Sequence, residues 1–173
     1  MTYTIIHTLK FIVFTGLLFL FSFGIFTSSA HAYFTTNQSA IVLNDHTVLF
    51  LIDYTFGTPA HEVNLPVKAL NSTEKQSDAV SFSILDKDNA IVAGKTTSMV
   101  LSTAELNAQK MYVTSKNIGK KFTLAVFFTP ESSELEKKYR LQVNHLPFYF
   151  DGAQQLQLNP SELVYYTTKY ISL

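Results

Sequence analysis

The feature that most constrains this fold is an alternation of apolar and polar side chains that begins after Tyr33. The clearest run covers residues 47–56, where apolar side chains take every second position: Val48, Phe50, Ile52, Tyr54 and Phe56. Successive side chains of a β-strand point to opposite faces, so this period of two predicts a strand with one face in a core. Leu49 and Leu51 make the other face half apolar, as in the middle of a sheet.

Further alternating runs follow, separated by turn residues such as Asn44-Asp45 and Asp151-Gly152. The expected strands cover residues 34–43, 61–70, 80–84, 90–93, 95–101, 111–114, 122–129, 138–145, 148–150, 156–158 and 163–171. Pro66 cannot donate to a ladder, which predicts an edge strand or a bulge. Helical turns are expected only at 103–109, 130–137 and 159–162.

This spacing predicts an all-β domain, an antiparallel β-sandwich of about seven to nine strands. A β-barrel of the lipocalin type is the alternative.

The segment around Tyr139 resembles the corner that opens the sixth strand of immunoglobulin-like and fibronectin-III-like domains. A polar loop that contains Leu135 leads into Tyr139-x-Leu141-x-Val143. In those domains a Tyr hydroxyl bonds the backbone a few residues upstream. The resemblance implies an immunoglobulin-like sandwich and a hydrogen bond from Tyr139 to the backbone of residues 133–136. The chain has no Cys and no Trp, so the Cys pair and core Trp of true immunoglobulin domains are absent.

The first 32 residues have the three parts of a secretion signal. Lys10 is their only cation, residues 11–26 are an uncharged apolar run, and Ala30-His31-Ala32 fits a peptidase site. We expect cleavage after Ala32, which leaves one β-sandwich domain over residues 33–173. The alternative is an uncleaved membrane anchor, although the apolar run is shorter than the roughly 20 residues that span a bilayer.

Composition narrows the location and the partners. A chain of this size buries a core without disulfides, and an exported domain without Cys fits a bacterial periplasm or cell surface best. The 13 Asp and Glu and all but one of the 13 Lys and Arg follow residue 32. With no basic surplus, we expect no binding to nucleic acid, and membrane contact only through an uncleaved N-terminal segment.

Asp86, Asp88 and Asn89 have the closely spaced oxygens of a calcium loop. The Gly and distal Glu of an EF-hand are missing, and Ala90 continues into an apolar run. A hairpin turn is the favoured interpretation, with Ca²⁺ as the alternative.

No catalytic constellation is visible in the sequence. His46, His61 and His145 lack metal-ligand spacing, and Ser72-x-x-Lys75 lies in a polar loop without companion motifs. A hydrolase would require such groups to converge in a cleft. We therefore expect no enzymatic activity, no metal and no cofactor.

The leading hypothesis is an exported protein-binding, adhesion or surface-assembly module, with a protein or glycan of the cell envelope as partner. The alternative is a carbohydrate-binding module that uses exposed aromatic faces. Its candidate ligand-facing rings are Tyr149, Tyr165 and Tyr166, although ordinary strand packing also favours aromatics.

Overall fold

The computed structural model describes residues 35–57, 60–116, 118–135, 137–151 and 154–173. The chain divides into two units, Met1–Ala30 and His31–Leu173, and all the described residues belong to the second. The expected signal segment, with Ala30 and Ala32, lies outside the described residues. Within them, no helix has the length and apolar character needed to cross a membrane.

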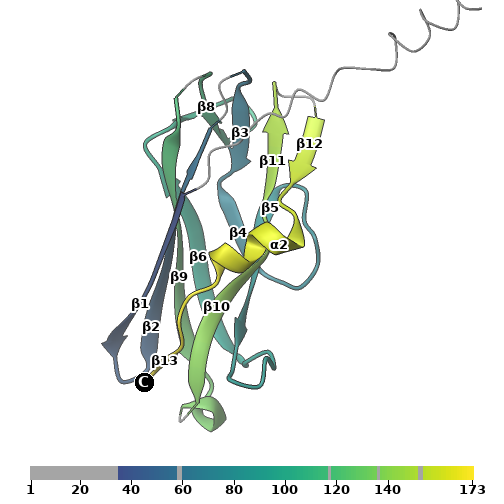
Figure 1. Ribbon diagram of the computed structural model, residues 1–173. Coiled ribbons are helices and arrows are strands. Elements are labelled where there is room, and N and C mark those ends of the chain that lie inside the picture. Colours follow the sequence, from purple (N-terminus) through teal and green to yellow (C-terminus); the bar gives the residue numbers. More distant parts are fainter. Residues whose placement is uncertain (1–34, 58–59, 117, 136, 152–153) are drawn as a thin grey trace, which may run out of the picture. The chain divides into compact units, whose positions relative to one another are not determined.

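The described unit is predominantly β and its sheets are antiparallel apart from one strand pair, which confirms the all-β prediction. The antiparallel sheet with the longest strands, which we call the main sheet, has the order β1-β2-β9-β6 (Figure 1). Its strands are β1 (Thr35–Asn44), β2 (Thr47–Phe56), β9 (Lys120–Pro130) and β6 (Gly94–Ser102).

Two further sheets complete the unit. The second has the order β13-β10-β5-β4 and contains the single parallel pair, β4 with β5. Its strands are β13 (Ile171–Ser172), β10 (Lys138–His145), β5 (Ala79–Leu85) and β4 (Lys68–Asn71). The third runs in the order β12 (Gln154–Gln157), β11 (Pro147–Phe150), β3 (Val63–Pro66), β8 (Met111–Thr114) and β7 (Glu105–Leu106). The helical turns are η1 (Ser132–Glu134), α2 (Pro160–Leu163) and η2 (Val164–Tyr166).

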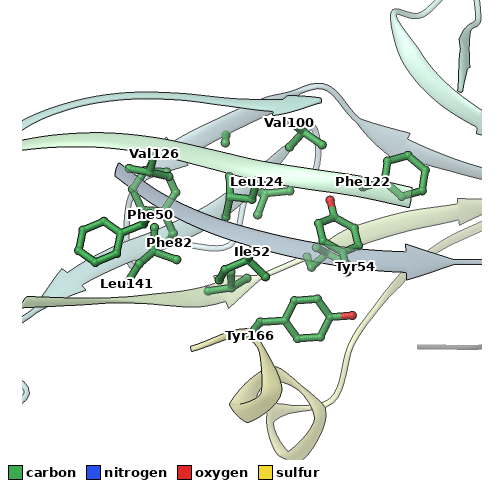
Figure 2. Close-up of a cluster of buried hydrophobic side chains, with 14 of the residues drawn as sticks. Phe50, Ile52, Tyr54, Phe82, Val100, Phe122, Leu124, Val126, Leu141 and Tyr166 are labelled. Carbon is green, nitrogen blue, oxygen red and sulfur yellow. The ribbon is translucent and has the colours of Figure 1, made fainter. Parts of the chain in front are cut away.

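The core lies between the main sheet and the second sheet. Burial alternates without a break along β2, so the inward face predicted from the sequence is confirmed. Figure 2 shows side chains of β2 and β9 in one cluster with Phe82 of β5 and Leu141 of β10. The rings of Phe128 and Tyr139 meet edge to face at 5.5 Å between centroids, which joins β9 to β10.

Both faces of β5 are buried, not only the apolar face. Ser81 and Ser83 are almost fully enclosed. Asn144 Nδ2 donates to Ser83 Oγ at 2.7 Å and to the Ser72 carbonyl at 2.9 Å. These bonds hold the start of the polar loop 72–78 beside the strand, and thereby shape one wall of a cleft described below.

The continuous strand predicted over residues 61–70 is divided between two sheets. β3 ends at Pro66 and β4 begins at Lys68. The strand β3 as a whole lies between β11 and β8, so it is not an edge strand, but β11 pairs only with Val63 and Asn64, and Pro66 therefore has a partner on the β8 side alone. A missing N–H is tolerated at the last residue of β3, where the ladder ends.

Three other expected elements differ. The strand expected over 90–93 is wrong, because these residues contribute only an isolated bridge from Ile91 to Leu85. The prediction of a helical turn at 103–109 is wrong. Asn107 Oδ1 accepts the N–H groups of Gln109 and Met111 at 3.0 and 2.9 Å, and these bonds close a turn between β7 and β8. The strand expected over 163–171 is replaced by η2 and the short β13. There Thr168 bonds both backbone groups of Leu141, which gives an irregular attachment to β10 in place of a ladder.

The expected hydrogen bond of Tyr139 is confirmed. Its hydroxyl donates to the backbone carbonyl of Glu134, within the predicted range, while its ring is fully buried. The bond fixes the loop that carries η1 against the start of β10.

We expect Tyr139→Phe to lower the free energy of unfolding by about 1 kcal/mol, because the ring stays but the Glu134 carbonyl keeps only its bond from the Lys137 N–H. Chemical denaturation measures the change. The matched control is Tyr170→Phe, since Tyr170 is 41% exposed and its bond to the Asp86 carbonyl is longer, at 3.3 Å. Equal losses in the two variants would contradict a special role for the Tyr139 corner.

Candidate functional site

The outward face of the main sheet carries a contiguous group of apolar side chains. Residues directly opposite each other in paired strands share a face. The register aligns Ile41 with Leu49 and Leu49 with Phe127, and it aligns Leu51 with Ala125 and Ala125 with Met99. We define the outer patch as Ile41, Leu49, Leu51, Met99, Leu101 and Phe127.

The outer patch is accessible. Ile41, Met99, Leu101 and Phe127 are between 39% and 47% exposed, and Leu49 and Leu51 are half-buried. Large apolar side chains that cluster on a surface are uncommon in monomeric proteins, whereas scattered ones are ordinary. The patch is therefore a candidate for contact with another macromolecule.

Polar groups border the outer patch. At one end, Lys121 Nζ lies 2.8 Å from Asp53 Oδ2, and Thr123 donates to Asp53 Oδ1 at 2.6 Å. Burial opposes ionisation of Asp53, but the bonds from Lys121 and Thr123 outweigh it, so the pKa of Asp53 lies below its ordinary value. At the other end, the hydroxyls of Thr47 and Thr129 are 3.3 Å apart. An apolar centre with a polar border is the usual anatomy of a protein interface.

Both edges of the main sheet are already in contact with other parts of the unit. On the β1 side, Gln38 Nε2 donates to the Tyr165 carbonyl. On the β6 side, Val100 N donates to the Val67 carbonyl at 3.1 Å, and Ser98 Oγ to the Ala69 carbonyl at 2.8 Å. These contacts occupy part of the β6 edge and one position on β1, and the apolar side chains gather on the face of the sheet rather than at its edges.

A second candidate is a cleft of about 460 Å³ beside the polar loop 72–78. We call it the His145 cleft, and its lining residues are Lys75, Gln76, Ser77, His145, Leu156 and Gln157. They come from three separate segments: the loop, the end of β10, and β12. The cleft combines an ammonium group, an imidazole, two amides, a hydroxyl and one apolar side chain.

The three aromatic residues proposed as ligand-facing do not form one platform. Tyr166 is buried, and its ring packs edge-on against Tyr54 at 5.7 Å between centroids. Tyr165 is 64% exposed in the same helical turn. Tyr149 lies on β11 and donates to the Ser77 carbonyl at 2.6 Å. The carbohydrate hypothesis is thus left with two rings on different elements.

The histidines do not converge. His46 is exposed in the turn between β1 and β2. His61 Nδ1 lies 2.9 Å from Asp151 Oδ2, and its ring stacks on Phe150. Of these three histidines, His145 is the one that lines the cleft. Ser72 Oγ accepts the N–H of Glu74 at 3.0 Å, as a turn residue does.

Asp86 and Asp88 form a turn, as expected. Asp86 Oδ1 accepts the N–H groups of Asp88 and Ala90, both at 2.9 Å. The bond from Ala90 is the main cause that keeps the pKa of the Asp86 carboxyl below its ordinary value. Among the described residues, no group of three or more His, Cys, Asp or Glu side chains is placed to hold a metal ion.

Sequence reasoning missed both the outer patch and the His145 cleft. Alternation on β2 placed Leu49 and Leu51 on one face, but the register that adds Phe127 and Met99 is a long-range property. Leu156 and Gln157 reach the cleft only through the pairing of β11 with β12. Neither grouping has a local signature in the sequence.

No family model matches this chain, and no curated protein is similar enough in sequence to count as a relative.

We expect folding stability to fall as the pH is lowered from about pH 7.5 to about pH 5.5. Burial, aided by the charge of Lys75, holds the pKa of His145 below its ordinary value of 6.5. The unfolded chain therefore binds this proton more readily than the folded chain, and acid favours unfolding. The contribution of His145 to stability is fully present above its pKa in the unfolded chain. It is lost as the pH falls through its lower pKa in the folded chain.

Urea denaturation at several pH values measures this slope. His145→Gln should flatten it, whatever its effect at neutral pH, and the exposed His46→Gln should retain it. An unchanged slope in His145→Gln would contradict the assignment.

Proposed function

We propose that this chain is an exported, non-enzymatic assembly module of the bacterial periplasm or cell surface. In this proposal an immunoglobulin-like β-sandwich pairs with a second copy of itself through the outer patch. The observation that carries it is the apolar group aligned across four strands of the main sheet, on a face with a polar border. An uncleaved N-terminal anchor remains the alternative to release.

Strand order supports an immunoglobulin-like arrangement. In such domains the strands A to G form one sheet in the order A-B-E-D and another that contains C, F and G. The strands β1, β2, β5, β6, β9, β10 and β13, assigned to A through G in chain order, reproduce both sheets. The Tyr139 corner then falls at the start of strand F, which is its usual place. β3, β4, β7, β8, β11 and β12 are additions to this plan.

The size of the face favours a second copy of the chain. Nine residue pairs join β2 to β9. At about 3.4 Å per residue and about 4.8 Å per strand, four strands present a face on the order of 600 Å². Two copies would bury roughly 1,200 Å² together, which exceeds the roughly 1,000 Å² expected of a specific interface.

Charge also favours self-association. The border holds Asp53 and Lys121 as a neutral pair, and the whole chain has a formal net charge of +0. Lys95, opposite Thr129 at the far border, is the one further charge among the described residues of this face, so two identical faces bring together little like charge. A two-fold axis lets each apolar side chain meet an equivalent surface, which is the commonest symmetry of homo-oligomers.

The whole chain is expressed, and the protein recovered from the host is studied by sedimentation velocity. We expect a dimer whose population increases with protein concentration. Phe127→Lys should weaken dimerisation by about tenfold or more, because a buried cation replaces a central aromatic contact. The control is Leu70→Lys, an apolar residue outside the patch that is 44% exposed, against 39% for Phe127. A wild-type protein that stays monomeric at every accessible concentration, or equal weakening in both variants, would overturn the proposal.

Export is tested separately. When the full chain is expressed in a bacterial host, we expect mass spectrometry of the exported protein to show an N-terminus at Tyr33. A full-length protein in the membrane fraction would favour the anchor, and a full-length protein in the cytosol would contradict export.

A further inference from the structure

We propose that the His145 cleft binds a small organic carboxylate, with the ligand's carboxylate beside Lys75 and His145 and its uncharged polar body against the amides of the cleft. This inference is independent of pairing through the outer patch, since the two surfaces share no residue.

Hydrogen bonds hold the walls of the cleft in place before any ligand arrives. Tyr149 donates to the Ser77 carbonyl at 2.6 Å, and Asn144 donates to the Ser72 carbonyl at 2.9 Å. Lys68 Nζ pairs with Asp78 Oδ2 at 2.8 Å where the loop joins β5. The loop is therefore tied near both ends, which reduces the entropy that binding would have to remove.

The ammonium group of Lys75 has no carboxylate partner among the described residues, since none lies within 4.0 Å of it. Lys75 lines the cleft and repels a proton on the imidazole of His145. Two groups that can both be cationic thus share one cavity, and an anion between them would relieve their repulsion.

His145 is only 5% exposed, and the backbone of Gln76 accepts a hydrogen bond from its ring. A protonated imidazole has two N–H donors, so one remains for a ligand when Gln76 takes the other. Burial and Lys75 keep the pKa of His145 low in the free protein. A bound carboxylate would raise the pKa of His145. By thermodynamic linkage, the affinity of the protein for the carboxylate must then rise as the ring of His145 becomes protonated.

The remaining lining residues fit an uncharged polar body. Gln76 and Gln157 each supply amide donors and acceptors, and Leu156 supplies an apolar surface. A volume of about 460 Å³ lies within the range of ordinary small-molecule sites. An acidic sugar and the carboxylate end of a short peptide both have this chemistry.

Among the described residues, the groups that line the cleft with His145 or pair with it come from three segments. Lys75 and Gln76 belong to the loop, Ser81 is its partner on β5, and Leu156 and Gln157 belong to β12. Lys75 is the only one of these that carries a charge, so the pH dependence of binding should report His145 itself.

The test is an NMR titration of the histidine rings in the protein obtained from the whole chain. The probes are glucuronate and N-acetylalanine, and their neutral counterparts are glucose and N-acetylalanine amide. We expect at least one carboxylate to shift the His145 resonances and raise the pKa of His145, while its neutral counterpart does neither. Comparison of the two carboxylates distinguishes a sugar from a peptide source.

Lys75→Met should weaken carboxylate binding by about tenfold or more, the usual effect of losing a charged hydrogen bond. Lys87→Met, an exposed lysine on the Asp86 turn, should bind as the wild type does. His46 and His61 lie outside the cleft and serve as internal references. Three results would overturn the inference: no shift of His145 with either carboxylate, equal shifts with the neutral compounds, or unchanged affinity in Lys75→Met.

Discussion

The structure depends on the burial of one face of β2 and β9 against β10 and β5. The side chains on that face of β2 are fully buried, and no polar group interrupts it apart from the phenol of Tyr54. Nine consecutive residue pairs join β2 to β9, so the two strands present their apolar side chains as one surface. Because a shift of one residue would turn every apolar side chain outward, this burial also fixes the register of the main sheet. The position of the outer patch follows from the same register.

Local patterns predicted the strands that alternate strongly, and they failed where side chains bond the backbone. β2, β9 and β10 followed from their period of two, and the turn at α2 followed from its capping box. The helical turn predicted at 103–109 is absent because Asn107 closes a turn there. The strand predicted at the end of the chain is absent because Thr168 attaches that segment to β10. Such hydrogen bonds depend on which segments are neighbours in the folded chain. The local sequence pattern does not contain that information.

The two candidate sites were harder to predict than the fold. Aromatic residues were singled out by type, yet Tyr166 enters the core while its neighbour Tyr165 remains exposed, because a tight helical turn directs consecutive side chains differently. The outer patch needs three strand registers, and the His145 cleft needs three segments that are distant in sequence. The sequence identified individual candidate residues, including His145 at the end of an inward-facing run, but not how they group in space.

The contacts along both edges of the main sheet limit how copies of this chain can assemble. An open strand edge accepts a neighbour whose own far edge then accepts another, and this growth leads to fibres. Here the carbonyls of Val67 and Ala69 accept bonds from β6 at positions where such growth would begin, and Gln38 joins β1 to the Tyr165 carbonyl. Contact through a flat face related by a two-fold axis ends with the pair, so an exposed apolar sheet can be retained without polymerisation.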